Sequence, residues 1–186
     1  MTAPPDDYKR VLSHLAGGVV IVTTTGPGGE LRGMTATAVC SVSVDPPLVM
    51  ACMQQSATTH GAVQGSGVFA LNILPASERD LAQRFASSLE DKFFGVGVEM
   101  GASGAPLLTA ALAHCDCRVE HSVVAGDHTI FIGRVLSAAS RDDGDRPLLY
   151  FRGDYGSVGP VEATDPDEGD QKTGDDEPGD AESGGA

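Results

Sequence analysis

Residues 33–60 read Gly-Met-Thr-Ala-Thr-Ala-Val-Cys-Ser-Val-Ser-Val-Asp-Pro-Pro-Leu-Val-Met-Ala-Cys-Met-Gln-Gln-Ser-Ala-Thr-Thr-His. The run of small hydroxyl and alanine residues predicts a long strand over 34–44, which ends before Pro46 and Pro47 because proline cannot donate to a sheet. A second apolar strand is predicted over 48–53. The Ser/Thr/His cluster at 56–60 then lies where a helix can begin, and the unpaired N–H groups of a helix N-terminus favour anions. Because small side chains let a flat ring approach the backbone, this stretch predicts a site for a planar ligand with a phosphate tail.

The remaining sequence supplies further strands and two helices. β-branched residues predict a strand over 19–25, and the Gly/Pro run at 26–29 predicts a hairpin turn that returns into the long strand. Other strands are predicted over 68–74, 111–124, 129–140 and 148–151, and helices over 6–16 and 77–88, the second with Ser77 as its N-cap. The connections between strands are too short for parallel crossovers. We therefore predict a mainly β fold, an antiparallel barrel with a few peripheral helices.

The negative charge of the chain is concentrated at its C-terminus. Residues 161–186 hold ten of the 26 acidic residues and one of the 12 basic residues, so they contribute −9 to the net charge of −14. This Gly- and Pro-rich tail has almost no large apolar residue and is expected to be disordered, whereas residues 1–160 are expected to form one domain. The body of the protein carries only −5 and has no basic stripe, so we expect neither nucleic acid nor a membrane as a partner.

Cysteine usage and hydropathy indicate a cytoplasmic protein. No segment resembles a signal peptide, and no apolar run approaches the roughly 20 residues that cross a bilayer. The four cysteines lie in strand-like sequence without a Cys-x-x-Cys pair, so reduced thiols are expected. On a strand, Cys115 and Cys117 would point to one face and His114 to the other. The segment 114–117 therefore does not predict a metal site.

Three further features allow more than one interpretation. The glycines at 95, 97 and 101 resemble a dinucleotide-binding turn, but no adequate strand precedes them and no helix can follow, so we predict a loop. His60 lies in the expected anion cluster, although a histidine on a helix surface would give the same pattern. His128 follows Gly126 and Asp127 in the turn between the two longest strands, where a structural turn residue and a functional group are both compatible with the sequence.

Several motifs occur together and in order over residues 8–158. They are Gly33-Met34-Thr35-Ala36-Thr37-Ala38, Ser41-Val42-Ser43-x-x-Pro46-Pro47, Ser56-x-x-Thr59-His60, Asp91-Lys92-Phe93, Gly126-Asp127-His128 and Arg152-Gly153-x-Tyr155. In this combination the chain resembles the flavin reductase family, the small reductase components of two-component flavin-dependent monooxygenases. The resemblance implies the FMN-binding split barrel, an antiparallel split β-barrel of Greek-key type.

The resemblance also implies a site. By similarity, the flavin ring of FMN or FAD would lie against Met34, Thr35, Ala36, Thr37, Ser41, Val42 and Ser43, while Cys52, Met53 and Gln54 would flank the ring and the ribityl chain. The phosphate would be bound by Ser56, Thr59 and His60, with Lys92 and Phe93 closing over it. His128, the candidate catalytic residue, would position the nicotinamide of NADH or NADPH rather than act as an acid. Tyr155 would cover the site from the partner subunit of a homodimer.

The implied activity is that of an NAD(P)H:flavin oxidoreductase, which delivers reduced flavin to a separate oxygenase. Gln55 and Thr58 stand where relatives often carry Arg, and Asp154 stands where a basic residue is common, so FMN is favoured over FAD. One alternative is a flavin-binding electron carrier or storage protein without NAD(P)H turnover, which would share every flavin contact. A pyridoxamine-phosphate-oxidase-like enzyme would share the barrel, but it fits the Gly-Asp-His turn less well.

Overall fold

The computed structural model describes residues 2–141 and 144–159, and the predicted acidic tail over 161–186 lies outside them. Within these ranges the helices are α1 (Pro5–Leu12), α2 (Thr58–Ser66) and α3 (Arg79–Ala86), and a short 3-10 helix, η1 (Ala76–Glu78), precedes α3. The strands are β1 (Gly17–Gly18), β2 (Val20–Thr25), β3 (Leu31–Ala36), β4 (Val39–Ser43), β5 (Leu48–Gln54), β6 (Val68–Ile73), β7 (Val98–Met100), β8 (Pro106–Leu108), β9 (Ala113–Ala125), β10 (His128–Ser140), β11 (Leu148–Phe151) and β12 (Asp154–Ser157).

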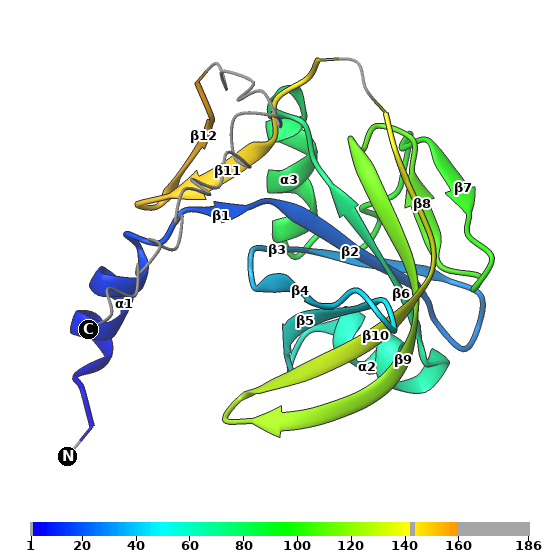
Figure 1. The fold of residues 1–186 in the computed structure, drawn as a ribbon, viewed down its shortest axis with the longest axis horizontal. Helices are drawn as coiled ribbons and strands as arrows, with labels where there is room; N and C mark the ends of the chain where they lie inside the picture. Colours follow the sequence, from blue (N-terminus) through cyan, green and yellow to red (C-terminus); the bar gives the residue numbers. More distant parts are fainter. Residues whose placement is uncertain (1, 142–143, 160–186) are drawn as a thin grey trace, which may run out of the picture.

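The main sheet closes into a barrel. Its strands pair antiparallel in the order β3-β2-β6-β9-β10-β5-β4, so β3 and β4 lie at opposite edges, yet only Thr37 and Ala38 separate them in the chain. Three Cα steps span at most about 11 Å, whereas a flat sheet of this size would hold its edges roughly 29 Å apart. The sheet must therefore roll up until its two edge strands approach each other (Figure 1). The N–H of Cys52 in β5 donates to the Ala38 carbonyl oxygen at 2.9 Å, which extends the β4–β5 pairing into this short connection. The predicted antiparallel barrel is confirmed.

The predicted long strand over 34–44 is wrong. The chain ends β3 at Ala36, crosses from one edge of the sheet to the other, and starts β4 at Val39. The two residues at the break are Thr37 and Ala38, so no glycine or proline marks it in the sequence. β4 then pairs with β5, and its register shifts between Ser41 and Ser43.

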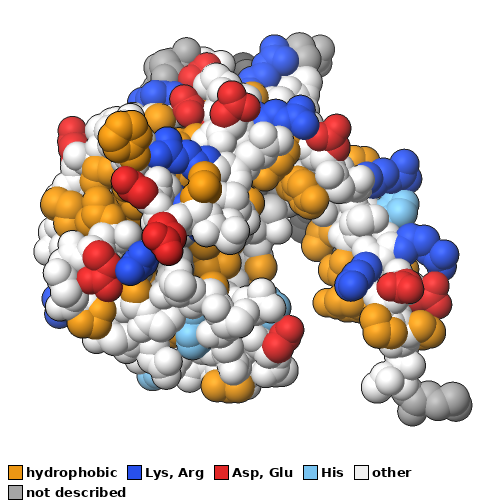
Figure 2. Space-filling view, turned by 180° about the vertical axis from the view of Figure 1, so that it is seen from behind, with side chains coloured by type: hydrophobic (Ala, Val, Ile, Leu, Met, Phe, Trp, Pro, Cys, Tyr) orange, Lys and Arg blue, Asp and Glu red, His pale blue; other side chains and the backbone are white. Residues whose placement is uncertain are grey.

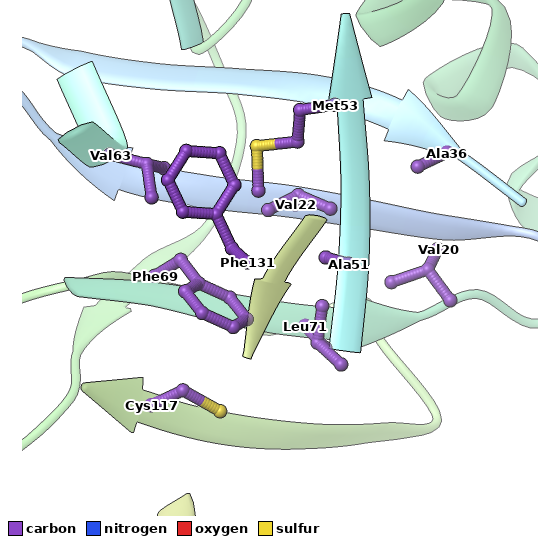
Figure 3. Packing of buried hydrophobic residues seen from close by; sticks show 10 residues of the cluster. All are labelled: Val20, Val22, Ala36, Ala51, Met53, Val63, Phe69, Leu71, Cys117 and Phe131. Atoms are coloured by element: carbon purple, nitrogen blue, oxygen red, sulfur yellow. The ribbon is translucent and has the colours of Figure 1, made fainter. Parts of the chain in front are cut away.

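Two hydrophobic clusters share strand β2. Val20 and Val22 point into the barrel, where they join Ala36, Ala51, Met53, Val63, Phe69, Leu71, Cys117 and Phe131 (Figure 3). Val19 and Ile21 point to the opposite face and pack with Leu74, Ala82, Phe85, Leu108, Ala111 and Leu148, beneath α3. Since alternate residues of an extended chain face opposite sides, the apolar run 19–22, made of Val19 and the first three residues of β2, serves both clusters. Helix α2 contributes Val63 to the first cluster, and Figure 3 shows this side chain beside the Phe131 ring.

Helix α1 extends away from the barrel as an arm (Figure 1) and has no buried residue. It ends at Leu12, so the predicted helix over 6–16 is one turn too long. Its apolar residues Tyr8, Val11 and Leu12, and the following Leu15, are all exposed. In Figure 2 hydrophobic side chains line the side of the arm that faces the body.

The remaining differences from the sequence predictions are local. Ser77 lies in η1, and Glu78 occupies the N-cap position of α3 without a capping side-chain bond. The predicted loop around 95–101 contains the short strand β7, which pairs with β8, and no dinucleotide-binding turn forms there. In the two ranges that the structure covers, every helix is too short or too polar to cross a bilayer.

Candidate functional site

A cleft of about 790 Å³ opens beside the barrel, within the size range of small-molecule sites. Three segments that are distant in sequence form its walls: strand β3, the β5–α2 junction, and the end of α3 with the loop that follows it. The lining residues are Leu31, Arg32, Gly33, Met34, Thr35, Gln54, Ser56, Ala57, Thr58, Thr59, Phe85, Ala86, Ser87, Ser88, Leu89, Glu90, Lys92 and Phe93.

Gly33 allows two aromatic rings to pack directly on the backbone of β3. A Cβ atom at this position would lie 2.6 Å from Cε1 of Phe85 and 3.3 Å from Cζ of Phe93. The two rings meet edge to face, with their centroids 4.9 Å apart. Thr35 ties the same strand to α3, because its hydroxyl donates to the Ala82 carbonyl oxygen at 2.6 Å. This wall of the cleft therefore depends on the absence of a side chain at Gly33.

The N-terminus of α2 presents unpaired donors to the cleft. Ala57 occupies the N-cap position, where its methyl group cannot accept a hydrogen bond as Ser, Thr or Asp would. The N–H groups of His60 and Gly61 are directed to the Ala57 carbonyl oxygen, whereas those of Thr58 and Thr59 have no acceptor among the described residues. Ser56 and Thr58, which are exposed, and the buried Thr59 also line this cleft. This arrangement suits an anion.

Lys92 brings a positive charge to the same cleft. Its ammonium donates to the carbonyl oxygens of Phe85 at 2.9 Å and Gly33 at 3.4 Å, which leaves one of its three N–H donors for a ligand. Burial lowers the pKa of the Lys92 ammonium. A bound anion would stabilise the charged form, so this lysine fits a phosphate. Arg32 also lines the cleft, but its guanidinium lies 3.9 Å from the Glu30 carboxylate.

Seven of the residues that the resemblance assigned to cofactor binding line this one cleft. They are Met34, Thr35, Gln54, Ser56, Thr59, Lys92 and Phe93. The remaining lining residues were not among the predicted site residues: Leu31, Arg32, Gly33, Ala57, Thr58 and the segment 85–90. Thr58 stands within the predicted anion cluster, so the sequence contained a signal for it. The segment 85–90 reaches the cleft only because α3 packs on β3, which no local pattern indicates.

The structure does not bring three of the predicted residues to the cleft, because their side chains face the interior. Ala36 and Met53 point into the barrel and belong to its core. His60 is only 7% exposed. Its ring packs against Phe131, and its Nε2 lies 2.8 Å from the Thr129 hydroxyl oxygen. His60 is the third residue of α2, so its side chain is directed under the helix rather than toward its N-terminus.

A second group lies on the outer surface of the barrel. Thr37, Ser41 and Val42 are exposed, and Ser43 and Cys52 are half-buried, on or beside the edge strand β4. Burial and the nearby Asp127 carboxylate raise the pKa of the Cys52 thiol. None of these five residues lines the described cleft.

His128 begins β10 directly beside the cleft. It pairs with Gln54 in the β10–β5 ladder, and Gln54 is itself a lining residue. Nδ1 of His128 lies 2.7 Å from Oδ1 of Asp127, and this hydrogen bond lowers the pKa of the Asp127 carboxyl. The imidazole is half-exposed, so it remains accessible to a ligand.

Tyr155 lies in β12 and does not line the described cleft. Its ring is 5.3 Å from that of Tyr150, and the Arg79 guanidinium lies 5.5 Å from its centroid. The side chain also packs against the cluster beneath α3. In the described part of the chain, no three His, Cys, Asp or Glu side chains converge as metal ligands would.

Comparison with known proteins identifies similar chains. A family model described as "Flavin reductase like domain" matches residues 12–159. The flavin reductase (NADH) of Kitasatospora aureofaciens is 40% identical over 159 residues, which cover 84% of this chain and 83% of that protein. The flavin-dependent monooxygenase reductase subunit HsaB of Rhodococcus jostii is 35% identical over 156 residues, which cover 84% and 79%. The solved structure of the NADH:FAD oxidoreductase SgcE6 of Streptomyces globisporus, in complex with NAD and FAD fragments, has a TM-score of 0.79 at 34% identity and covers 88% of this chain and 99% of that one.

Proposed function

Because this chain belongs to the flavin reductase-like family, we propose that it is an NADH-dependent flavin reductase that supplies reduced flavin to a separate oxygenase. The relatives support this assignment: one is named a flavin reductase (NADH), and another a reductase subunit of a flavin-dependent monooxygenase. The observation that carries the proposal is that the unpaired donors of α2 and the ammonium of Lys92 line the same cleft. These groups fit the phosphate of a flavin nucleotide.

FMN is the flavin that we propose as the preferred substrate. The charged side chains that line the described cleft are Arg32, Glu90 and Lys92, and Arg32 lies near Glu30. Lys92 and the donors of α2 suit one phosphate group. The second phosphate of FAD would have no comparable unpaired cation among the described lining residues, so we expect weaker binding of FAD.

The protein contributes geometry to this reaction. Hydride transfer between the two nucleotides is chemistry that they supply themselves when both are bound. Ser56, Thr58 and Lys92 would hold the phosphate end of the flavin, and Met34 on β3 would support its ring. His128, oriented by Asp127, would position the nicotinamide next to the ring. Holding two reactants in register is a large part of what an enzyme supplies to such a step.

A purified full-length sample mixed with NADH and excess FMN tests the proposal. We expect loss of nicotinamide absorbance over many turnovers, because the flavin is a substrate that leaves after reduction. A carrier or storage protein would stop after one equivalent of bound flavin. Parallel assays with NADPH and with FAD test the two preferences. Unchanged fluorescence of FMN and FAD at micromolar protein would contradict the flavin site itself.

We also propose a homodimer. The apolar residues Tyr8, Val11, Leu12 and Leu15 of the arm are exposed, as are Val123 and Val124 in the β9–β10 hairpin. Exposed apolar groups of this extent are typical of protein contacts. Light scattering of the full chain should give twice the monomer mass, and changing Val11 and Leu15 to Ser should weaken association. Lys9→Ser, on the same helix, is the control, and a native monomer would contradict the proposal.

A further inference from the structure

One residue holds all three carbonyl groups of the Gly126-Asp127-His128 turn. The backbone N–H of Gln55 donates to the Asp127 carbonyl oxygen at 3.0 Å. The side-chain Nε2 of Gln55 lies 3.4 Å from the Gly126 carbonyl oxygen and 3.2 Å from that of His128. These three bonds attach the turn to the segment that follows β5.

Gln55 is placed between two parts of the proposed site. It follows Gln54, the last residue of β5, and precedes Ser56, which lines the cleft beside the N-terminus of α2. A second link runs parallel to it, because His60 of α2 is bonded to Thr129 of β10. The phosphate end of the cleft and the start of β10 are thus joined by contacts that run through the β5–α2 junction.

The turn depends on such contacts, since it lies at the end of a projecting hairpin. Residues 121–127 are all exposed. His128 still pairs with Ala125 and Gln54 in the ladders, but Gly126 and Asp127 lie beyond the last paired residues. Asp127 is also the residue that orients the His128 ring. The side chain of Gln55 thus holds the carbonyl groups of the residues on either side of Asp127. Its loss would loosen the segment that carries the carboxylate bonded to the imidazole.

We propose that Gln55 is a positioning residue that fixes the Asp127–His128 pair relative to the phosphate end of the cleft. The inference rests on the proposed flavin reduction, in which His128 contacts the nicotinamide. Gln55 does not line the described cleft, so in this proposal it contacts neither nucleotide. An amide suits the role because its NH₂ group can donate to two carbonyl oxygens, whereas a carboxylate at this position can only accept. Loss of this residue should therefore impair the use of NADH without impairing the binding of flavin.

A double-mutant cycle with His128 tests the inference. The variants are Gln55→Ala, His128→Ala and the double variant, assayed for NADH kcat/KM at saturating FMN. We expect Gln55→Ala to lower kcat/KM roughly tenfold in the native background, and less than about twofold once His128 is absent, because the residue acts through that imidazole. The FMN dissociation constant, measured by fluorescence, should stay within about twofold. Gln55→Glu should lower kcat/KM at least as much as Gln55→Ala.

Gln64→Ala provides the matched control, since Gln64 is an exposed glutamine on α2. Thermal unfolding of each variant separates a loss of folded protein from a loss of positioning. The inference is overturned if Gln55→Ala leaves kcat/KM for NADH unchanged, or lowers it by the same factor with and without His128. It is also overturned if the affinity for FMN falls by a factor similar to that for kcat/KM. A native protein that fails to oxidise NADH with FMN would instead overturn the proposed function.

Discussion

Nε2 of His60 lies 2.8 Å from the hydroxyl oxygen of Thr129, in the interior beneath the first turn of α2. The ring also packs against Phe131, with centroids 5.3 Å apart. These contacts attach the buried face of α2 to β10. Other residues of the same helical turn line the cleft. His60 therefore packs behind the proposed anion site, whose lining residues Ser56, Thr58 and Thr59 are its neighbours in sequence.

His60→Ala should destabilise the fold and spare the ligand site. The change removes a buried hydrogen bond and leaves a cavity next to Phe131, so we expect a loss of about 2–4 kcal/mol in the free energy of unfolding. The folded variant should bind FMN within about twofold of the native affinity. Denaturant unfolding and FMN fluorescence titration measure the two quantities. A tenfold loss of affinity at unchanged stability would show that the ring contacts the ligand.

Ser56→Ala should have the opposite effect: it should weaken FMN binding and leave the stability of the fold unchanged. Ser56 is exposed and lines the cleft, so its loss leaves the core intact but removes one donor from the proposed phosphate site. We expect FMN binding to weaken by about 1 kcal/mol or more, with kcat at saturating FMN unchanged because the bond is made equally in the ground and transition states. Ser77→Ala, at an exposed serine of η1, is the control. Equal effects of the two changes on the FMN dissociation constant would refute this role for Ser56.

Gly33→Ala should damage both the fold and the cleft. The added methyl group would lie 2.6 Å from the Phe85 ring, which is fully buried and cannot swing aside. Overpacking of this kind costs about 1–3 kcal/mol. Displacement of Phe85 and Phe93 should also lower FMN affinity. Gly61→Ala is a matched control, because nothing beyond the neighbouring backbone of its own helix lies within 4 Å of the added Cβ and alanine favours the helix. We expect a higher melting temperature for that variant.

The barrel was predictable from sequence because its strands carry local signals, but the point at which the chain crosses between the two edges of the sheet was not. Nothing in the composition of Thr37 and Ala38 distinguishes a break from a continuing strand, and the break follows from the order of seven strands in the sheet. Two walls of the cleft lie within residues 33–60, so one contiguous stretch indicated them. The third wall depends on a contact between Gly33 and Phe85, which are far apart in the chain. The orientation of His60 likewise depends on where Thr129 lies.

The position of His128 illustrates the same limit. The Gly126-Asp127-His128 turn was visible in the sequence, whereas the register that places His128 opposite Gln54 is a property of the β10–β5 ladder. A shift of one residue would turn the imidazole to the other face of the sheet. The sequence therefore identified His128 and its turn, whereas the register of the sheet places this residue beside the cleft.

Lys92 should make FMN binding sensitive to alkaline pH. Burial lowers the pKa of its ammonium, so the free protein loses this proton at a lower pH than an exposed lysine would. A bound phosphate favours the charged form and raises the pKa again. FMN affinity should then be constant below the pKa of the free protein and fall as the pH rises through it, with a proton taken up on binding in that window.

Lys92→Arg separates this effect from titration of the flavin itself. Arginine keeps its charge throughout the range and can still donate to the carbonyl oxygens of Gly33 and Phe85. For Lys92→Arg, the decrease in FMN affinity at alkaline pH should be limited to the part that titration of the flavin causes. Lys92→Met should bind FMN about tenfold more weakly at neutral pH. The ligand-free native protein should gain stability with pH in the same window, because its unfolded chain binds more protons. Identical pH profiles for the native protein and Lys92→Arg would exclude Lys92 from the phosphate site.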